Sequence, residues 1–123
     1  MIRKRVVARI LMWSAVFTAV AMALSPQPPA LPIDAYGDKF EHMLAFAVMA
    51  LLAAIAYPEV PLTRTAERLS FLGSLIEVGQ SIPFLHRDCD IRDWFADTAA
   101  VMVVLGLYAL VRRLSGRRSL AAT

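Results

Sequence analysis

The chain has 123 residues, of which 59% are hydrophobic and only 19% are charged, and its formal net charge is +3. A water-soluble domain usually contains about 45–50% apolar and about 25% charged residues, so this composition argues against a soluble protein. Nucleic-acid binding needs a basic patch with interleaved aromatic side chains on a folded face, and the short basic tail at residues 112–118 does not provide one, so a nucleic-acid partner is excluded.

The first predicted helix covers residues 6–24. Arg9, near its start, is its only charged residue. A helix that crosses the hydrocarbon core of a bilayer needs about 17–25 mostly apolar residues, so this segment is predicted to span a membrane. Its basic start and the sequence Ala21-Met22-Ala23 also fit a secretory signal, but its apolar run exceeds the usual signal core of about 7–15 residues. We therefore expect a retained helix, with cleavage as the alternative.

Three further helices are predicted, over residues 40–57, 63–82 and 94–111. The second and fourth helices of the chain are almost entirely apolar beyond their first turn. The third is more polar, and it should end before Pro83 because proline disfavours helical geometry in the residue that precedes it. The prediction is therefore an all-α fold, in which residues 1–123 form one integral membrane four-helix bundle.

The basic residues predict the orientation of this bundle. Ten of the 13 Lys and Arg residues lie on the side that carries both termini: Arg3, Lys4, Arg5, Arg9, Arg64, Arg68, Arg112, Arg113, Arg117 and Arg118. Cytoplasmic loops of membrane proteins carry an excess of Lys and Arg, so both termini are expected in the cytoplasm. Eight of the ten acidic residues lie on the opposite, outer side: Asp34, Asp38, Glu41, Glu77, Asp88, Asp90, Asp93 and Asp97.

Polar residues also occur in pairs at the outer ends of the last three helices. Each pair has a spacing of three or four residues, which places both side chains on one helical face. The pairs are Asp38 with His42, Glu77 with Gln80, and Asp93 with Asp97. Ionisable residues within membrane helices usually face the bundle interior and pair with one another, so the three faces should enclose one polar pocket that opens outward. Lys39 and Arg87 are the expected counter-charges, although Asp38 and Asp93 also fit ordinary roles at helix N-termini.

These residues, in this order, resemble the pattern of the VanZ-like family of small membrane proteins. The matching elements are D-K-x-x-H at residues 38–42, E-x-x-Q at residues 77–80, and then Arg87, Asp93 and Asp97. Asp97 stands where the family more often has Asn, and Ala99 and Ala100 stand where it often has Gly. The resemblance implies a multi-pass protein of the bacterial cytoplasmic membrane, in a family named for a member linked to reduced sensitivity to the glycopeptide antibiotic teicoplanin. The family has no settled biochemical activity.

Three functions fit these observations. The first is an enzyme that acts on a lipid-linked or cell-wall precursor at the outer leaflet, with His42 or Glu77 as the general acid or base. The remaining pocket residues would bind the substrate: Asp38, Lys39, Gln80, Arg87, Asp93 and Asp97. The second is a non-catalytic membrane protein that binds an envelope component in the same pocket. The third, a small proton- or ion-coupled permease, is disfavoured because no ionisable residue lies near the middle of a predicted span.

We expect no cofactor and no metal from the sequence. The segment His86–Asp90 offers metal-ligand types, but it lacks the Cys and His spacings typical of zinc sites. A hard cation held by carboxylates beside a phosphate is the alternative. The expected partners are membrane lipids and a phosphate-bearing lipid-linked envelope precursor, and a unit of this size is also compatible with assembly into a homo-oligomer.

Overall fold

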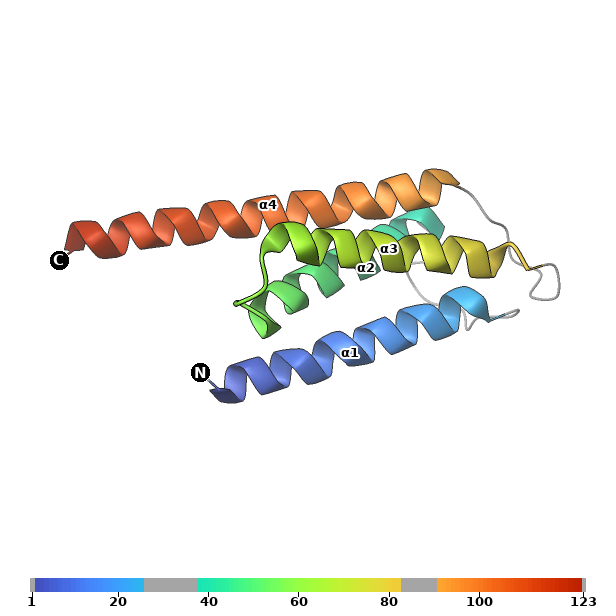
Figure 1. The fold of residues 1–123 in the computed structure, drawn as a ribbon, viewed down its shortest axis with the longest axis horizontal. Helices are drawn as coiled ribbons and strands as arrows, with labels where there is room; N and C mark the ends of the chain where they lie inside the picture. Colours follow the sequence, from blue (N-terminus) through green and yellow to red (C-terminus); the bar gives the residue numbers. More distant parts are fainter. Residues whose placement is uncertain (1, 26–37, 83–90, 123) are drawn as a thin grey trace.

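Four α-helices account for nearly all of the described residues. The structure, a computed structural model, describes residues 2–25, 38–82 and 91–122 (Figure 1). Its helices are α1 (Ile2–Leu24), α2 (Asp38–Ala56), α3 (Leu62–Gln80) and α4 (Ile91–Ala122). No strand occurs in these ranges, and the prediction of an all-α fold is confirmed for them.

The bounds of three helices differ most from the sequence prediction. The first helix was expected to begin at Val6, but α1 begins at Ile2. The fourth helix was expected to end at Val111, but α4 continues to Ala122. Its basic extension consists largely of Arg, Leu and Ala, which are strong helix formers, with Gly116 as the weakest position. The third helix was expected to reach Ile82, but α3 ends at Gln80 and the chain turns at the next residue.

Helices α1 and α4 have their main contacts with other helices and not with each other. Helix α2 packs against both α1 and α4, and α3 packs chiefly against α4, with smaller contacts to α1 and α2. Both chain termini lie at the same end of the molecule, so α2 and α4 begin, and α1 and α3 end, at the opposite end (Figure 1). We call these the terminal end and the opposite end.

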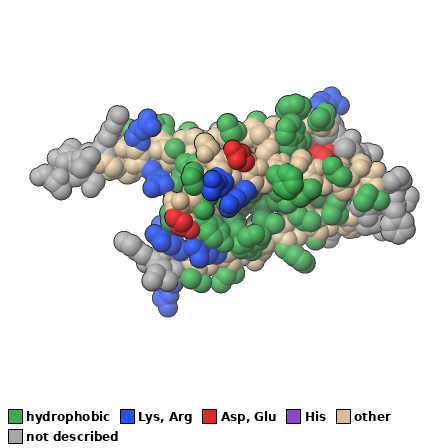
Figure 2. Space-filling view, in the orientation of Figure 1, with side chains coloured by type: hydrophobic (Ala, Val, Ile, Leu, Met, Phe, Trp, Pro, Cys, Tyr) green, Lys and Arg blue, Asp and Glu red, His purple; other side chains and the backbone are tan. Residues whose placement is uncertain are grey.

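Small apolar side chains are common in the interior and large apolar side chains are common on the surface, which is the reverse of a typical soluble bundle. Six of the buried apolar residues are alanines, whereas many large apolar side chains are exposed, and Phe17 is 76% exposed. Large apolar residues are exposed on all four helices; they include Ile10, Phe17, Leu44, Phe71, Val78, Met102, Val103 and Leu107. Figure 2 shows apolar side chains over much of one face, and most Lys and Arg side chains on that face lie toward the terminal end.

Two helices are long and apolar enough to cross a membrane by length and composition. These are the stretches Arg3–Leu24 in α1 and Ile91–Gly116 in α4. The apolar part of α2, Phe40–Ala56, is shorter. Within the described residues, helix α3 is not apolar enough to meet this criterion for a membrane span, since the charged residues Arg64, Glu67 and Arg68 lie in its first two turns.

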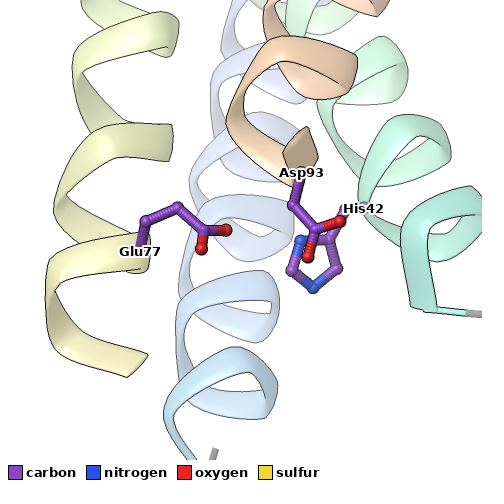
Figure 3. A group of neighbouring side chains, drawn as sticks. All are labelled: His42, Glu77 and Asp93. Carbon is purple, nitrogen blue, oxygen red and sulfur yellow. The ribbon is translucent and has the colours of Figure 1, made fainter. Parts of the chain in front are cut away.

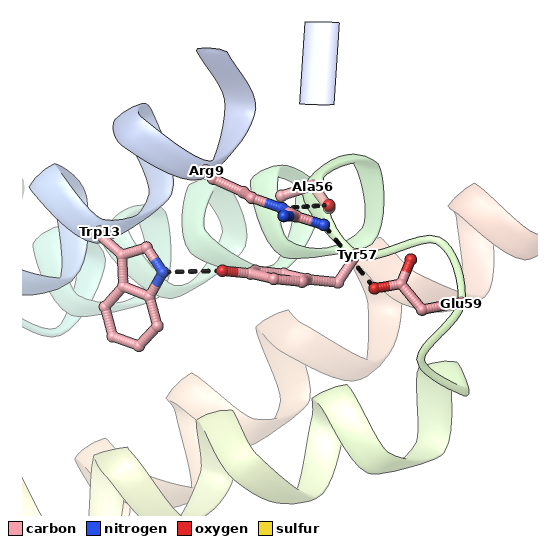
Figure 4. Close-up of polar contacts among 5 residues, drawn as sticks. All are labelled: Arg9, Trp13, Ala56, Tyr57 and Glu59. Atoms are coloured by element: carbon pink, nitrogen blue, oxygen red, sulfur yellow. Dashed lines mark hydrogen bonds and ion pairs between the residues drawn. The ribbon is translucent and has the colours of Figure 1, made fainter. Parts of the chain in front are cut away.

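At the terminal end, α1 is tied to the turn between α2 and α3 by a group of polar and aromatic contacts (Figure 4). Arg9 Nε donates a hydrogen bond of 3.1 Å to the Ala56 carbonyl, and its guanidinium lies 4.5 Å from the centre of the Tyr57 ring. Trp13 Nε1 donates to the Tyr57 hydroxyl at 3.0 Å. Arg9 also lies 3.8 Å from a carboxylate oxygen of Glu59. The Arg9 contact satisfies a carbonyl that the end of α2 leaves without a helical donor.

Helices α3 and α4 are joined through polar groups and a glycine. Trp94 Nε1 donates a 3.0 Å hydrogen bond to the Ser70 carbonyl, and the Ser70 and Thr98 hydroxyls lie 3.0 Å apart. A Cβ atom at Gly73 would lie 3.4 Å from the Trp94 ring and 3.5 Å from the Phe46 ring. Small residues allow helices to approach closely where hydrophobic association is weak, as it is in lipid.

Candidate functional site

Three side chains from three helices converge near the opposite end of the bundle. His42 lies on α2, Glu77 on α3 and Asp93 on α4, and one ligand atom of each lies within 4.8 Å of those of the other two. Figure 3 shows the Glu77 carboxylate pointing from α3 toward Asp93 and His42. Glu77 is only 6% exposed, whereas His42 and Asp93 are partly exposed.

Asp97 adds a second carboxylate from α4 to this group. Its Oδ2 atom lies 3.8 Å from His42 Nδ1, and the residue is 2% exposed. Its other carboxylate oxygen, Oδ1, is buried and accepts no hydrogen bond from the described part of the chain. We refer to His42, Glu77, Asp93 and Asp97 as the four-residue cluster. It contains three carboxyl groups and one imidazole.

The apolar core lies directly beneath the cluster. Residues four positions apart lie on the same helical face, one turn from each other. Phe46 is therefore one turn below His42, Gly73 one turn below Glu77, and Val101 one turn below Asp97. Phe46 and Val101 are both almost fully buried. The same helical faces that form the core thus carry the polar cluster at the opposite end.

The position of Asp93 is also favoured by its own helix. It lies in the first turn of α4. The N-terminus of a helix carries a partial positive charge, which stabilises a nearby carboxylate. Helix α2 likewise begins beside the cluster, with His42 just beyond its first turn. Two helix N-termini therefore favour negative charge at this place.

Gln80, which was expected in the pocket, makes its hydrogen bond to another helix. Its Nε2 donates to the Ala23 carbonyl of α1 at 3.0 Å, and the residue is 2% exposed. Its Oε1 is buried and has no hydrogen-bond partner within the described ranges. Gln80 thus ties the end of α3 to α1, while Glu77, one turn earlier, faces α2 and α4.

The remaining residues of the expected site cannot be placed in this geometry. Arg87 and the side chains of Asp38 and Lys39 lie outside the described residues, as does the segment His86–Asp90. Arg92, at the start of α4, is exposed. The structure therefore brings together four of the eight predicted site residues, those of the four-residue cluster, and directs Gln80 toward α1.

Sequence reasoning did not single out the polar group at the terminal end. The predicted role of Arg9 concerns orientation. Helical spacing cannot predict its contacts with Tyr57 and Glu59, because these contacts join segments that are distant in the sequence. The available signal was a basic residue within an apolar run, one turn before Trp13. The exposure of this group favours a structural role rather than a second site.

An imidazole beside buried and half-buried carboxyl groups can exchange protons with a ligand, and it can also provide ligands for a cation. Comparison with known proteins does not distinguish between proton transfer and cation binding. No protein-family model, no curated protein and no solved structure matches the chain.

Proposed function

We propose that this chain is a VanZ-like multi-pass protein of the bacterial cytoplasmic membrane, and that its four-residue cluster binds and acts on a lipid-linked or cell-wall precursor. The observation that carries the proposal is the combination of an apolar exterior with an ionisable cluster at one end of the bundle interior. In membrane proteins, ionisable residues inside the bundle mark sites of function more often than sites of stability.

The surface of the bundle supports a lipid environment. A soluble protein rarely exposes large contiguous apolar patches, but residues such as Phe17, Phe71 and Val103 are exposed on three different helices. Small residues fill the helix contacts instead, as expected for helices that associate within lipid. Two of the helices have the length and apolarity to span a bilayer.

The charge distribution supports an outward-facing site. The described basic residues lie mainly at the terminal end, in α1 and in the extended part of α4, so that end is assigned to the cytoplasm. The four-residue cluster lies at the opposite end. It would then lie near the outer leaflet, where lipid-linked precursors of the cell wall are exposed.

The arrangement of His42 favours a role in proton transfer. General acid–base catalysis needs a group that titrates near neutral pH and is held in position. Asp97 of α4, at 3.8 Å from Nδ1, can orient the His42 ring. The Glu77 carboxylate approaches the same ring from α3. In this proposal, Lys39, Arg87 and Arg92 hold the phosphate of the precursor.

Lipid mass spectrometry of membranes from expressing bacteria tests this function. The wild-type protein should change the amount of at least one phosphate-bearing lipid relative to cells with an empty vector. His42→Ala and Glu77→Gln, expressed at equal levels, should abolish that change. Glu59→Gln is the matched control, because Glu59 is an exposed carboxylate at the terminal end.

Each outcome of that comparison has a defined meaning. If His42→Ala and Glu77→Gln alter the lipids as the wild type does, the cluster is not the functional site. If a lipid co-purifies with both the wild type and His42→Ala while the membrane lipids do not change, the protein binds its ligand without chemistry. Sensitivity to teicoplanin, measured on the same strains, tests the link to glycopeptide resistance.

A further inference from the structure

We propose that His42, Glu77 and Asp93 form a binding site for a divalent transition-metal cation, with Zn²⁺ and Mn²⁺ as the candidates. The sequence alone led to the expectation of no metal, because no segment of the chain carries ligands at zinc-site spacing. The structure assembles the ligands from three separate helices instead. This inference goes beyond the proposed function and holds whichever envelope component the protein recognises. While the cation is bound, His42 and Glu77 are its ligands and do not act as the general acid or base.

The types of ligand select the class of cation. Ca²⁺ and Mg²⁺ are bound almost entirely by oxygen atoms, whereas imidazole is a ligand for transition metals such as Zn²⁺. Carboxylates also bind Mn²⁺ and Zn²⁺. One imidazole with two carboxylates therefore favours a first-row divalent cation. Three protein ligands leave at least one coordination position for a water or a phosphate oxygen.

Asp97 supplies an independent indication that the cluster is built around a ligand. A histidine that binds a metal commonly directs its second ring nitrogen to a carboxylate, which fixes the ring and increases its basicity. Asp97, 3.8 Å from His42 Nδ1, would fill that role with Nε2 as the nitrogen that binds the cation. It is 2% exposed, and its Oδ1 atom has no hydrogen-bond donor among the described residues. Burying such an oxygen costs free energy, which is consistent with an additional component at the site.

The distances between the ligand atoms require a small closure. A tetrahedral ion about 2.1 Å from each ligand atom holds those atoms about 3.4 Å apart. The three ligand atoms lie within 4.8 Å of one another, so the widest separation must shorten by at most about 1.4 Å. Rotation about the side-chain bonds of Glu77, which reaches across from α3, can provide this change without movement of the helices.

Metal titration of the full-length protein in detergent micelles tests the site directly. After treatment with a chelator, added Mn²⁺ should bind at one saturable site per chain, measured by loss of the electron paramagnetic resonance signal of free Mn²⁺. Zn²⁺ should compete, whereas a large excess of Mg²⁺ should not. Saturating Mn²⁺ should also raise the unfolding temperature, because a ligand that binds only the folded state stabilises it.

Substitutions assign the site to named residues. His42→Ala, Glu77→Gln and Asp93→Asn should each weaken Mn²⁺ binding by about tenfold or more, and Asp97→Asn, at a positioning residue, should weaken it by about tenfold. Glu59→Gln should bind as the wild type does. Because Asp93 is partly exposed, Asp93→Asn should depend less on correct packing than the variants of the buried Glu77 and Asp97, and circular dichroism will show whether each variant folds.

The inference is overturned by any of three results. These are the absence of saturable Mn²⁺ and Zn²⁺ binding to the wild type, wild-type affinity in a folded Asp93→Asn protein, and displacement by Mg²⁺ as effective as that by Zn²⁺. The last result would indicate a site made of oxygen atoms alone, without His42.

Discussion

A polar atom inside an apolar helix bundle needs a partner within the protein, and Trp94 finds one in the backbone of α3. Its Nε1–H donates to the Ser70 carbonyl, although that carbonyl lies within a helix and already accepts from its own helix. The same Ser70 meets Thr98 through its hydroxyl. These two contacts hold α4 against α3 at Trp94 and Thr98, which are the sequence neighbours of Asp93 and Asp97 in the cluster.

We predict that Trp94→Phe lowers the stability of the bundle by at least about 1 kcal/mol, because it removes a partly buried hydrogen bond and some ring contact. The measurement is thermal or denaturant unfolding in detergent micelles. Trp13→Phe is the control, since Trp13 is largely exposed and should cost less. Equal losses for the two variants would show that the Ser70 contact has no special importance.

The close approach of two helices depends on whether a glycine lies at the contact between them. Gly73 on α3 faces the rings of Trp94 and Phe46, whereas a Cβ atom at Gly106 of α4 meets nothing within 4 Å. Both glycines are unfavourable for a helix to a similar degree. Only Gly73 lies at a packed contact that has no room for a large side chain, and it is one helical turn from Glu77.

The element-scale prediction compares these two glycines. Gly73→Leu should destabilise the protein by about 1–3 kcal/mol through overpacking and should separate Glu77 from His42. Gly73→Ala should be nearly neutral, because its Cβ contacts are close to ordinary van der Waals distances. Gly106→Leu should have little effect or stabilise the helix. Unfolding temperatures in one detergent provide the comparison, and a harmless Gly73→Leu would contradict the packing seen here.

For the whole molecule, an even number of antiparallel helices brings both termini to one end, which is also the basic end (Figures 1 and 2). Opposite it lie the N-termini of α2 and α4 and the four-residue cluster. In the proposed membrane arrangement, the basic terminal end is the cytoplasmic one, and the opposite end, which carries the cluster, is the outer one.

Labelling with a membrane-impermeant maleimide tests this topology. In intact cells Cys89, the only cysteine, should react. A cysteine introduced as Ser119→Cys in a Cys89→Ser background should react only after the membrane is opened. The Cys89→Ser protein is the blank. Reaction of both positions from the same side would refute the four-span arrangement and the outward-facing site.

The sequence alone predicts that the chain is helical, the approximate positions of the four helices, and the end at which the ionisable residues gather. These are local properties: apolar runs, a proline after the third helix and the asymmetry of charge can all be read without knowing which helices touch. It also identifies His42, Glu77, Asp93 and Asp97 as candidates, because each belongs to a pair of polar residues spaced three or four apart near one end of a helix.

Which face of each helix packs against which other helix is seen only in the folded structure. Glu77 and Gln80, three residues apart, point about 60° from each other on a helix with 3.6 residues per turn. Spacing alone placed them on one stripe, yet Glu77 faces α2 and α4 while Gln80 reaches Ala23 of α1. The rotation of α3 that separates them depends on contacts between distant segments, such as Gly73 against Phe46 and Trp94, and such contacts have no signature in local sequence.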